Sequence, residues 1–247
     1  MKYSISFVLP VYNEAANIED AVRRISALAG ELTDDYEVIA VDDASTDGSP
    51  DIADMIALKD PRVRSIRLKK NTKFGGALAV GLKNASKGVV VYTDADLPVR
   101  EEDVKKGLAL LDKADVITGY SLALKDTAIK RIVMSKVYNF LVQIFFGLNI
   151  KDINSGFKIY KLNVVKDLDL ISRSPFVDVE IFAEAKKRGF RIEQFGLLFE
   201  RRSKGASTIS RLSVIARTFL DMLIYKFSFT PHLLKGAGRM KKARGND

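Results

Sequence analysis

The chain has 247 residues, and its 40 lysines and arginines outnumber 31 aspartates and glutamates, giving a formal net charge of +9. It has no cysteine, which excludes a disulfide framework, a cysteine-ligated zinc and a thiol nucleophile. The single histidine, His232, excludes a histidine-cluster metal site and argues against a Ser-His-Asp triad. With 47% apolar residues, the chain can bury a core and is not a disordered protein.

The positive charge fits a solvated basic surface, an anionic membrane, a phosphorylated substrate or nucleic acid. Tryptophan is absent, and tyrosine and phenylalanine are scattered, so no aromatic platform for bases is visible and we expect no nucleic-acid partner. The N-terminal segment is apolar only briefly and lacks a small-residue cleavage site, which predicts a first strand rather than a signal peptide. No uncharged apolar run reaches about 18 residues, so we expect no transmembrane helix.

The first half of the chain alternates between apolar runs and amphipathic stretches. The expected strands are residues 5–9, 37–41, 63–68, 89–93 and 115–118, and the expected helices are residues 15–28, 49–58, 75–85 and 103–111. Apolar strands separated by helices are typical of βαβ units, whose parallel sheet is covered on both faces. The predicted fold class is therefore α/β and Rossmann-like, with a mostly parallel sheet.

The second half changes in rhythm. We expect a helix over 128–146, a loop over 152–157, a helix over 176–188 ending at Gly189, a strand over 191–199, a basic loop over 201–208 and a helix over 210–227. This pattern predicts three parts: a catalytic domain over 1–209, an amphipathic helix over 210–230, and a flexible basic tail over 231–247.

Carboxylates follow the expected strands at the edge where open parallel sheets bind ligands. Asp42 and Asp43 end the second strand, and Asp94 and Asp96 follow the fourth. Side chains at i and i+2 of an extended chain point to one side, so Asp94 and Asp96 repel each other unless a cation lies between them. Oxygen ligands suit Mg²⁺ or Mn²⁺ bound together with phosphates, although a turn or capping pair would use the same residues.

Six short motifs run along the chain: PVYNE at 10–14, VDDASTDG at 41–48, NTKFGGA at 71–77, DADL at 94–97, NSGFK at 154–158 and RxxGxS at 202–207. Their order and spacing resemble glycosyltransferase family 2, most closely its polyprenyl- and dolichyl-phosphate sugar synthases. The resemblance covers roughly residues 4–228. It implies a glycosyltransferase-A fold and a nucleotide-diphosphate sugar as donor.

The resemblance also implies a donor site. Donor-binding roles fall on Pro10, Val11, Tyr12 and Glu14 beside the base, Asp42 as its hydrogen-bond acceptor, and Asp94 and Ala95 near the nucleoside. Asp96 matches the metal ligand that bridges to the diphosphate, with Asp94 as a second ligand. The chain departs from the family at Pro98, where many relatives carry a Gln or Ser that can help the metal. This departure leaves the choice between Mg²⁺ and Mn²⁺ open.

The acceptor side rests on helical spacing. Arg131, Ser135, Asn139 and Gln143 recur every four residues and form one polar stripe, a spacing shared by ordinary solvent-facing stripes. A guanidinium and a hydroxyl one turn apart can grip phosphate. The resemblance places Arg131 and Ser135 at the acceptor phosphate, and we expect Asn154 and Ser155 to join them on the acceptor side.

Two catalytic roles remain. Arg202 matches the family's motif arginine and lies in a basic loop, which is either an ordinary surface loop or a flap that neutralises the leaving diphosphate. A hydroxyl acceptor would need a general base, for which Asp152, Asp178 and Glu180 are candidates. A phosphate acceptor is already anionic and needs none, so we expect Asp152 to orient the acceptor. For each of these three acids, a cap is an equal alternative.

The last helix, 210–227, is apolar on most sides, with a narrow polar stripe that includes Arg217 and Asp221. A buried core helix fits this pattern, but we favour a helix lying on a membrane beside a basic tail at 235–247. The expected location is the cytoplasmic face of a membrane, either as a peripheral protein or as the soluble part of an anchored enzyme.

The leading hypothesis is a metal-dependent, inverting transfer of mannose or glucose from GDP-mannose or UDP-glucose to a polyprenyl or dolichyl phosphate. An alternative keeps the family but transfers to a hydroxyl of a sugar or a lipid-linked saccharide. A remote alternative is a non-catalytic basic module that binds membrane or nucleic acid, which the carboxylates at the strand ends argue against.

Overall fold

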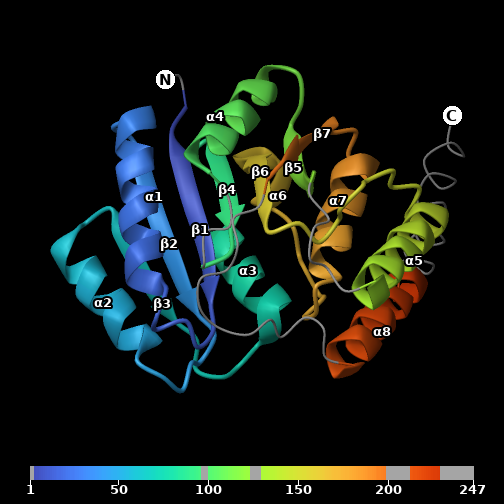
Figure 1. Ribbon diagram of the computed structural model, residues 1–247, viewed down its shortest axis with the longest axis horizontal. Helices are drawn as coiled ribbons and strands as arrows, with labels where there is room; N and C mark the ends of the chain where they lie inside the picture. Colours follow the sequence, from blue (N-terminus) through green and yellow to red (C-terminus); the bar gives the residue numbers. More distant parts are fainter. Residues whose placement is uncertain (1–2, 96–99, 123–128, 199–211, 229–247) are drawn as a thin grey trace, which may run out of the picture.

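The computed structural model describes residues 3–95, 100–122, 129–198 and 212–228 (Figure 1). Its centre is a seven-stranded sheet in the order β3-β2-β1-β4-β6-β5-β7. Adjacent strands are parallel except at β6, which runs antiparallel to β4 and β5. The strands are β1 Ile5–Val11, β2 Tyr36–Asp42, β3 Val63–Arg67, β4 Val89–Thr93, β5 Val116–Ser121, β6 Phe157–Lys161 and β7 Ile192–Leu197.

Helices cover both faces of this sheet, which confirms the predicted α/β class. One core joins β1, β2 and β4 to α1, α2 and α4, and the other joins the opposite face to α3, α5, α7 and α8 (Figure 1). The helices are α1 Ile18–Leu32, α2 Ser49–Lys59, α3 Lys73–Asn84, α4 Glu101–Ala109, α5 Ile129–Phe146, α6 Leu162–Val165, α7 Val177–Lys187 and α8 Leu212–Ser228, with a 3₁₀ turn at Leu110–Asp112.

Strand β6 is the one described strand that the sequence pattern does not predict. Its sequence, FKIYK, contains two lysines, whereas the other central strands are apolar runs. Lys158 is nevertheless completely buried. Because of these lysines the segment does not read as an apolar strand. Strand β6 also runs antiparallel to its neighbours, so it does not belong to a βαβ unit.

Helix α1 begins three residues later than predicted because a separate turn precedes it. The Asn17 amide donates to the Glu14 carbonyl, and the Ala15 amide donates to the Asp47 carboxylate at 3.1 Å. These bonds draw residues 14–17 toward the loop after β2. Gly189 follows α7 with a φ of +80°, the left-handed conformation expected of a glycine past a helix end.

Helix α8 has one buried and one exposed face. Met222 and Tyr225 pack into the core, and the carboxylate of Asp221 accepts the backbone amides of Arg173 and Ser174 at 3.2 and 3.0 Å. The helix is thus packed and hydrogen-bonded to the sheet domain. Within the described residues, no helix has both the length and the apolar character that crossing a bilayer requires.

Candidate active site

The site lies at the topological switch point of the sheet, between β1 and β4, where the strand order changes direction. Strand β1 lies between β2 and β4, and β2, β1 and β4 are parallel. Their carboxyl ends therefore meet at one edge, with Val11 opposite Asp42 in the register and Asp94 directly after β4. Such a switch point is where open α/β sheets bind ligands.

The loops after β1 and β2 bond to each other at this edge. The Asn13 amide donates to Ser45 Oγ at 2.9 Å, and the Glu14 amide donates to Ser49 Oγ at 2.8 Å. Asn13 has a φ of +57°, a left-handed conformation that asparagine tolerates better than most residues. The ring of Tyr12 is left 45% exposed above these loops, while Val11 is buried below.

Asp42 and Asp43 are adjacent and equally buried, yet they differ in their contacts. Asp43 Oδ1 accepts both the amide and the hydroxyl of Thr72, at 2.6 and 2.8 Å. Burial raises the pKa of Asp43, and the bonds from Thr72 only partly offset this. Asp42 Oδ2 accepts the Ser45 amide at 3.1 Å, while its Oδ1 has no hydrogen-bond partner among the described residues. Asp43 therefore anchors a loop, and Asp42 keeps an acceptor atom for a ligand.

Asp94 follows the last residue of β4, and a tyrosine of that strand bonds to its carboxylate. The hydroxyl of Tyr92, which is buried, donates to Asp94 Oδ1 at 2.6 Å. Burial, together with the charge of Asp94, raises the pKa of Tyr92 well above its usual value. Ala95 is buried next to Asp94, and Asp96 and Pro98 lie outside the described residues. In the part of the chain that is described, no three Asp, Glu, His or Cys side chains gather as a metal site.

A buried ion pair lies beneath the site. The ammonium of Lys158 is 3.1 Å from Asp178 Oδ2, and the two side chains are 0% and 2% exposed. Burial raises the pKa of Asp178 to about 6 although Lys158 opposes this, and the charges of Asp94 and Asp152 add to the rise. This contact occupies one oxygen of Asp178, a candidate base, while its Oδ1 has no hydrogen-bond partner among the described residues, and its role as a base stays a prediction.

Glu180, the other candidate base on α7, is also engaged in the interior. Its two oxygens accept the amides of Ile171 and Ser172 at 2.9 and 3.0 Å. The same segment contacts α3, because the Gly75 amide donates to the Arg173 carbonyl at 2.9 Å. A Cβ on Gly75 would lie 2.4 Å from the Ser172 carbonyl oxygen, which explains a glycine in the NTKFGGA motif.

The predicted acceptor loop follows α5. Asp152 is partly exposed, while Ser155 is buried and its hydroxyl bonds to the backbone of Phe157. Asn154 Oδ1 is buried without a hydrogen-bond partner in the described part of the chain. Asn139 of α5 donates to the Lys151 carbonyl at 2.8 Å and so ties the helix to this loop.

Besides Asp96, three predicted residues cannot be placed in this geometry. Arg131 and Ser135 lie one turn apart on the backbone of α5, but their side chains are outside the description, and so is Arg202. Their roles stay predictions. Lys158 is the residue that the sequence analysis missed, although its charge within an apolar run was a signal of a buried partner.

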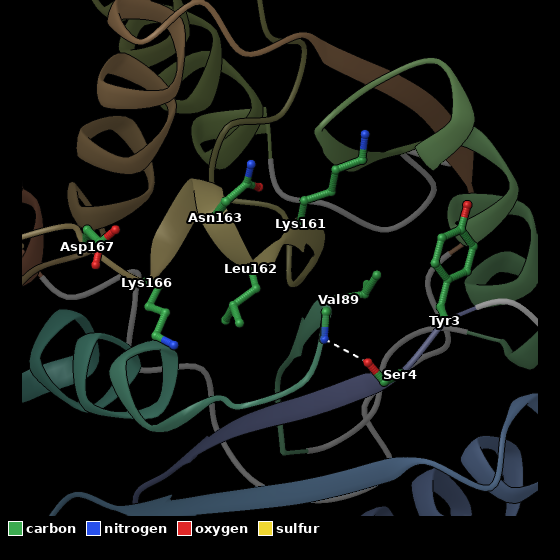
Figure 2. A pocket seen from close by; sticks show the side chains of 9 residues that line it. Tyr3, Ser4, Val89, Lys161, Leu162, Asn163, Lys166 and Asp167 are labelled. Carbon is green, nitrogen blue, oxygen red and sulfur yellow. Dashed lines mark hydrogen bonds between the residues drawn. The ribbon is translucent and has the colours of Figure 1, made fainter.

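A pocket of about 540 Å³ opens elsewhere (Figure 2). It lies at the amino ends of β1 and β4, beside Tyr3, Ser4 and Val89, and Lys161 and Lys166 come from β6 and the segment after it. The Gly88 amide donates to Ser4 Oγ at 2.9 Å across its floor. This pocket is at the edge of the sheet opposite Asp42 and Asp94, so it is separate from the candidate site.

Helices α5 and α8 lie side by side at one end of the molecule (Figure 1). The rings of Phe146 and Tyr225 are 5.8 Å apart, and Lys226 donates to the Phe145 carbonyl at 2.9 Å. Both helices expose large apolar side chains, which we call the α5–α8 apolar face. Its members are Val137, Phe140, Ile144 and Phe145 on α5, and Leu220, Leu223, Ile224 and Phe227 on α8.

Known proteins resemble this chain in sequence. Glycosyltransferase AglD of Haloferax volcanii is 33% identical over 208 residues, which are 79% of this chain and 33% of that protein. Polyprenol monophosphomannose synthase of Mycolicibacterium smegmatis is 27% identical over 82% of this chain and 80% of its own. An undecaprenyl-phosphate 4-deoxy-4-formamido-L-arabinose transferase of Yersinia enterocolitica is 27% identical over 71% of this chain and 54% of its own. The chain thus spans a third of the first relative and about half of the third.

Solved structures resemble it in fold. Glucosyl-3-phosphoglycerate synthase from Mycobacterium tuberculosis, crystallised with Mn²⁺, UDP and glucosyl-3-phosphoglycerate, has a TM-score of 0.68 at 20% identity over 91% of this chain and 80% of that one. The predicted glycosyltransferase-A fold is confirmed by this likeness. The family model of Glycosyl transferase family 2 matches residues 6–169, which include all three strands whose ends form the site. The chain therefore belongs to glycosyl transferase family 2.

Proposed function

We propose that this chain transfers a hexose from a nucleotide-diphosphate sugar to a polyprenyl or dolichyl phosphate at a membrane surface, with inversion at the anomeric carbon. The observation that carries the proposal is the junction at Asn139, which bonds to the loop before Asp152 while the next residue, Phe140, is 59% exposed. A polar loop and an exposed apolar helix adjoin there, as a lipid with a phosphate head requires. Two relatives are named for polyprenyl lipids of this kind.

The donor would bind at the ends of β1, β2 and β4. Asp42 Oδ1 is buried, and among the described residues it has no hydrogen-bond partner, so it can accept an N–H from a base. Tyr12 offers an exposed ring to the same base. Uracil and guanine both carry such an N–H, so UDP-glucose and GDP-mannose both fit.

A divalent cation, Mg²⁺ or Mn²⁺, would be held by Asp96 and Asp94. The fit rests on Asp94, whose carboxylate Tyr92 orients at the strand end and whose oxygens are of the type these ions prefer. The ion would supply positive charge to the leaving diphosphate. Arg202 would add a cation on the same group, where negative charge grows in the transition state.

A phosphate acceptor suits the acids near the site. Asp178 and Glu180 are both buried, and Asp178 is ion-paired with Lys158, which supports a reaction that needs no general base from α7. The lipid phosphate is itself the anionic nucleophile and needs positioning, which we assign to Arg131, Ser135 and the loop of Asp152. Its oxygen would attack the anomeric carbon opposite the leaving diphosphate.

The membrane would be met by the α5–α8 apolar face. Exposed apolar side chains gathered on two neighbouring helices mark interaction surfaces, and the tail after α8 carries five lysines and arginines against one aspartate. An apolar face beside a basic tail fits a bilayer with anionic head groups. The protein would act at the cytoplasmic face, peripherally or as the soluble part of an anchored enzyme.

The test is a transfer assay with purified protein, divalent cation, labelled UDP-glucose or GDP-mannose, and polyprenyl phosphate. We expect a labelled lipid-phosphate sugar, and label found only on a saccharide hydroxyl would favour the alternative acceptor. Chelation by EDTA and the D96A variant should both abolish turnover, whereas D51A, at an exposed carboxylate of α2, should leave it unchanged. Full turnover in D96A would rule out Asp96 as the essential metal ligand.

A further inference from the structure

Lys158 lies at the centre of the sheet, directly below the site. In the register it is opposite Tyr92 of β4 and opposite Thr118 of β5, so strands flank it on both sides. Its side chain is 0% exposed. A fully buried lysine is rare and costly unless its charge is paired and hydrogen-bonded.

The ammonium group of Lys158 carries three N–H donors and has three favourable neighbours. Its Nζ lies 2.5 Å from the Ser155 carbonyl oxygen, 3.1 Å from Asp178 Oδ2, and 5.1 Å from the centre of the Tyr92 ring. A carbonyl, a carboxylate and an aromatic face are all favourable partners for an ammonium group. Lys158 is therefore satisfied in the protein and has no contact left for a substrate.

Each neighbour leads to a different part of the site. Ser155 belongs to the loop that carries Asp152, and Tyr92 orients the carboxylate of Asp94 through its hydroxyl. Asp178 lies in the first turn of α7. One buried atom thus connects the predicted acceptor loop with the donor carboxylate.

We propose that Lys158 is a positioning residue that holds the 152–157 loop at a fixed place relative to Asp94. This inference rests on the proposed function only for the identity of the acceptor. A buried ion pair is a poor source of net stability, and apolar residues of similar size often replace one without loss. What an apolar pair cannot supply is the directional bond to the Ser155 carbonyl.

The test is the double variant K158M/D178N, which removes both charges and so avoids leaving one buried charge unpaired. Its matched control is K161M/D115N, which removes a second lysine–aspartate pair. Lys161 is also on β6, its Nζ is 2.8 Å from Asp115 Oδ1, and this pair lies away from the site.

We expect K158M/D178N to fold, to raise the acceptor KM about tenfold, and to leave the nucleotide-sugar KM within about twofold, since one charge-assisted bond is lost. Amide hydrogen exchange in 152–157 should speed up by a similar factor, while exchange in α1 stays constant. The control should change neither quantity.

The proposal is overturned if K158M/D178N matches the control in both exchange and acceptor KM. It is also overturned if no neutral pair folds, because Lys158 would then serve the fold and not the loop. If the unaltered chain transfers no sugar to polyprenyl phosphate while the exchange results are as expected, the proposed function fails and the positioning role stands.

Discussion

The hydroxyl of Tyr92 donates a 2.6 Å hydrogen bond to Asp94 from a position that is only 2% exposed. Tyr92 is on β4 and Asp94 follows that strand, so a rigid element of the core sets the direction of the carboxylate. A buried residue therefore orients a carboxylate of the proposed donor site.

Removing this hydroxyl in Y92F should weaken donor binding. A hydrogen bond to a charged group contributes about 1.5–3 kcal/mol, so we expect the nucleotide-sugar KM to rise about tenfold or more. Y160F is the matched control, because the Tyr160 hydroxyl is equally buried but has no hydrogen-bond partner among the described residues. Steady-state kinetics decide the question, and equal KM values for the two variants would contradict it.

Asp42 and Asp43 should separate binding from stability. We expect D42N to reduce nucleoside-diphosphate affinity about tenfold or more in calorimetry, because asparagine has one acceptor oxygen for two N–H donors, the Ser45 amide and the N–H of the base. D43A should instead lower the free energy of unfolding by about 1–3 kcal/mol, because Thr72 loses its partner. A D42N variant that binds normally would remove Asp42 from the donor site.

The strand pattern predicts these two aspartates as a pair, and only the family resemblance assigns the base to Asp42. Thr72 lies 29 residues from Asp43 along the chain, so the contact that turns one carboxylate into an anchor exists only after β2 and α3 have packed. Strand β4, in contrast, was predicted at its observed bounds, 89–93. A continuous apolar run between polar turns indicates a buried strand without any knowledge of its tertiary contacts.

Strand β6 and the ion pair of Lys158 share one reason for being missed. A lysine in a buried strand can be recognised from the sequence only if its ionic partner is known. Asp178 is 20 residues away, on a helix that packs on one face of the sheet. The strand-end carboxylates were predictable because a parallel sheet gathers its carboxyl ends at one edge. Which atoms are free there depends on tertiary contacts.

Asp178 should make stability depend on pH. Its pKa in the folded chain is raised to about 6, above the usual 3.8, so the folded state binds the proton more tightly than the unfolded state does. The unfolding free energy therefore falls as pH rises between these two values, by about 3 kcal/mol at most. Urea unfolding should therefore show that the unfolding free energy of the unaltered chain, minus that of K158M/D178N, rises by up to this amount as pH falls across the range. A difference that stays constant with pH would contradict the shift.

The α5–α8 apolar face should bind bilayers. Phe140 and Phe227 are 59% and 68% exposed, and burying each in the interface contributes about 1.5–3 kcal/mol, so F140E/F227E should weaken vesicle binding at least about tenfold. The matched control is M55E/L58E, which alters two exposed apolar residues of α2. Flotation with vesicles containing phosphatidylserine should separate the variants, and added salt should weaken binding by screening the basic tail. If both double variants float like the unaltered chain, another surface meets the membrane.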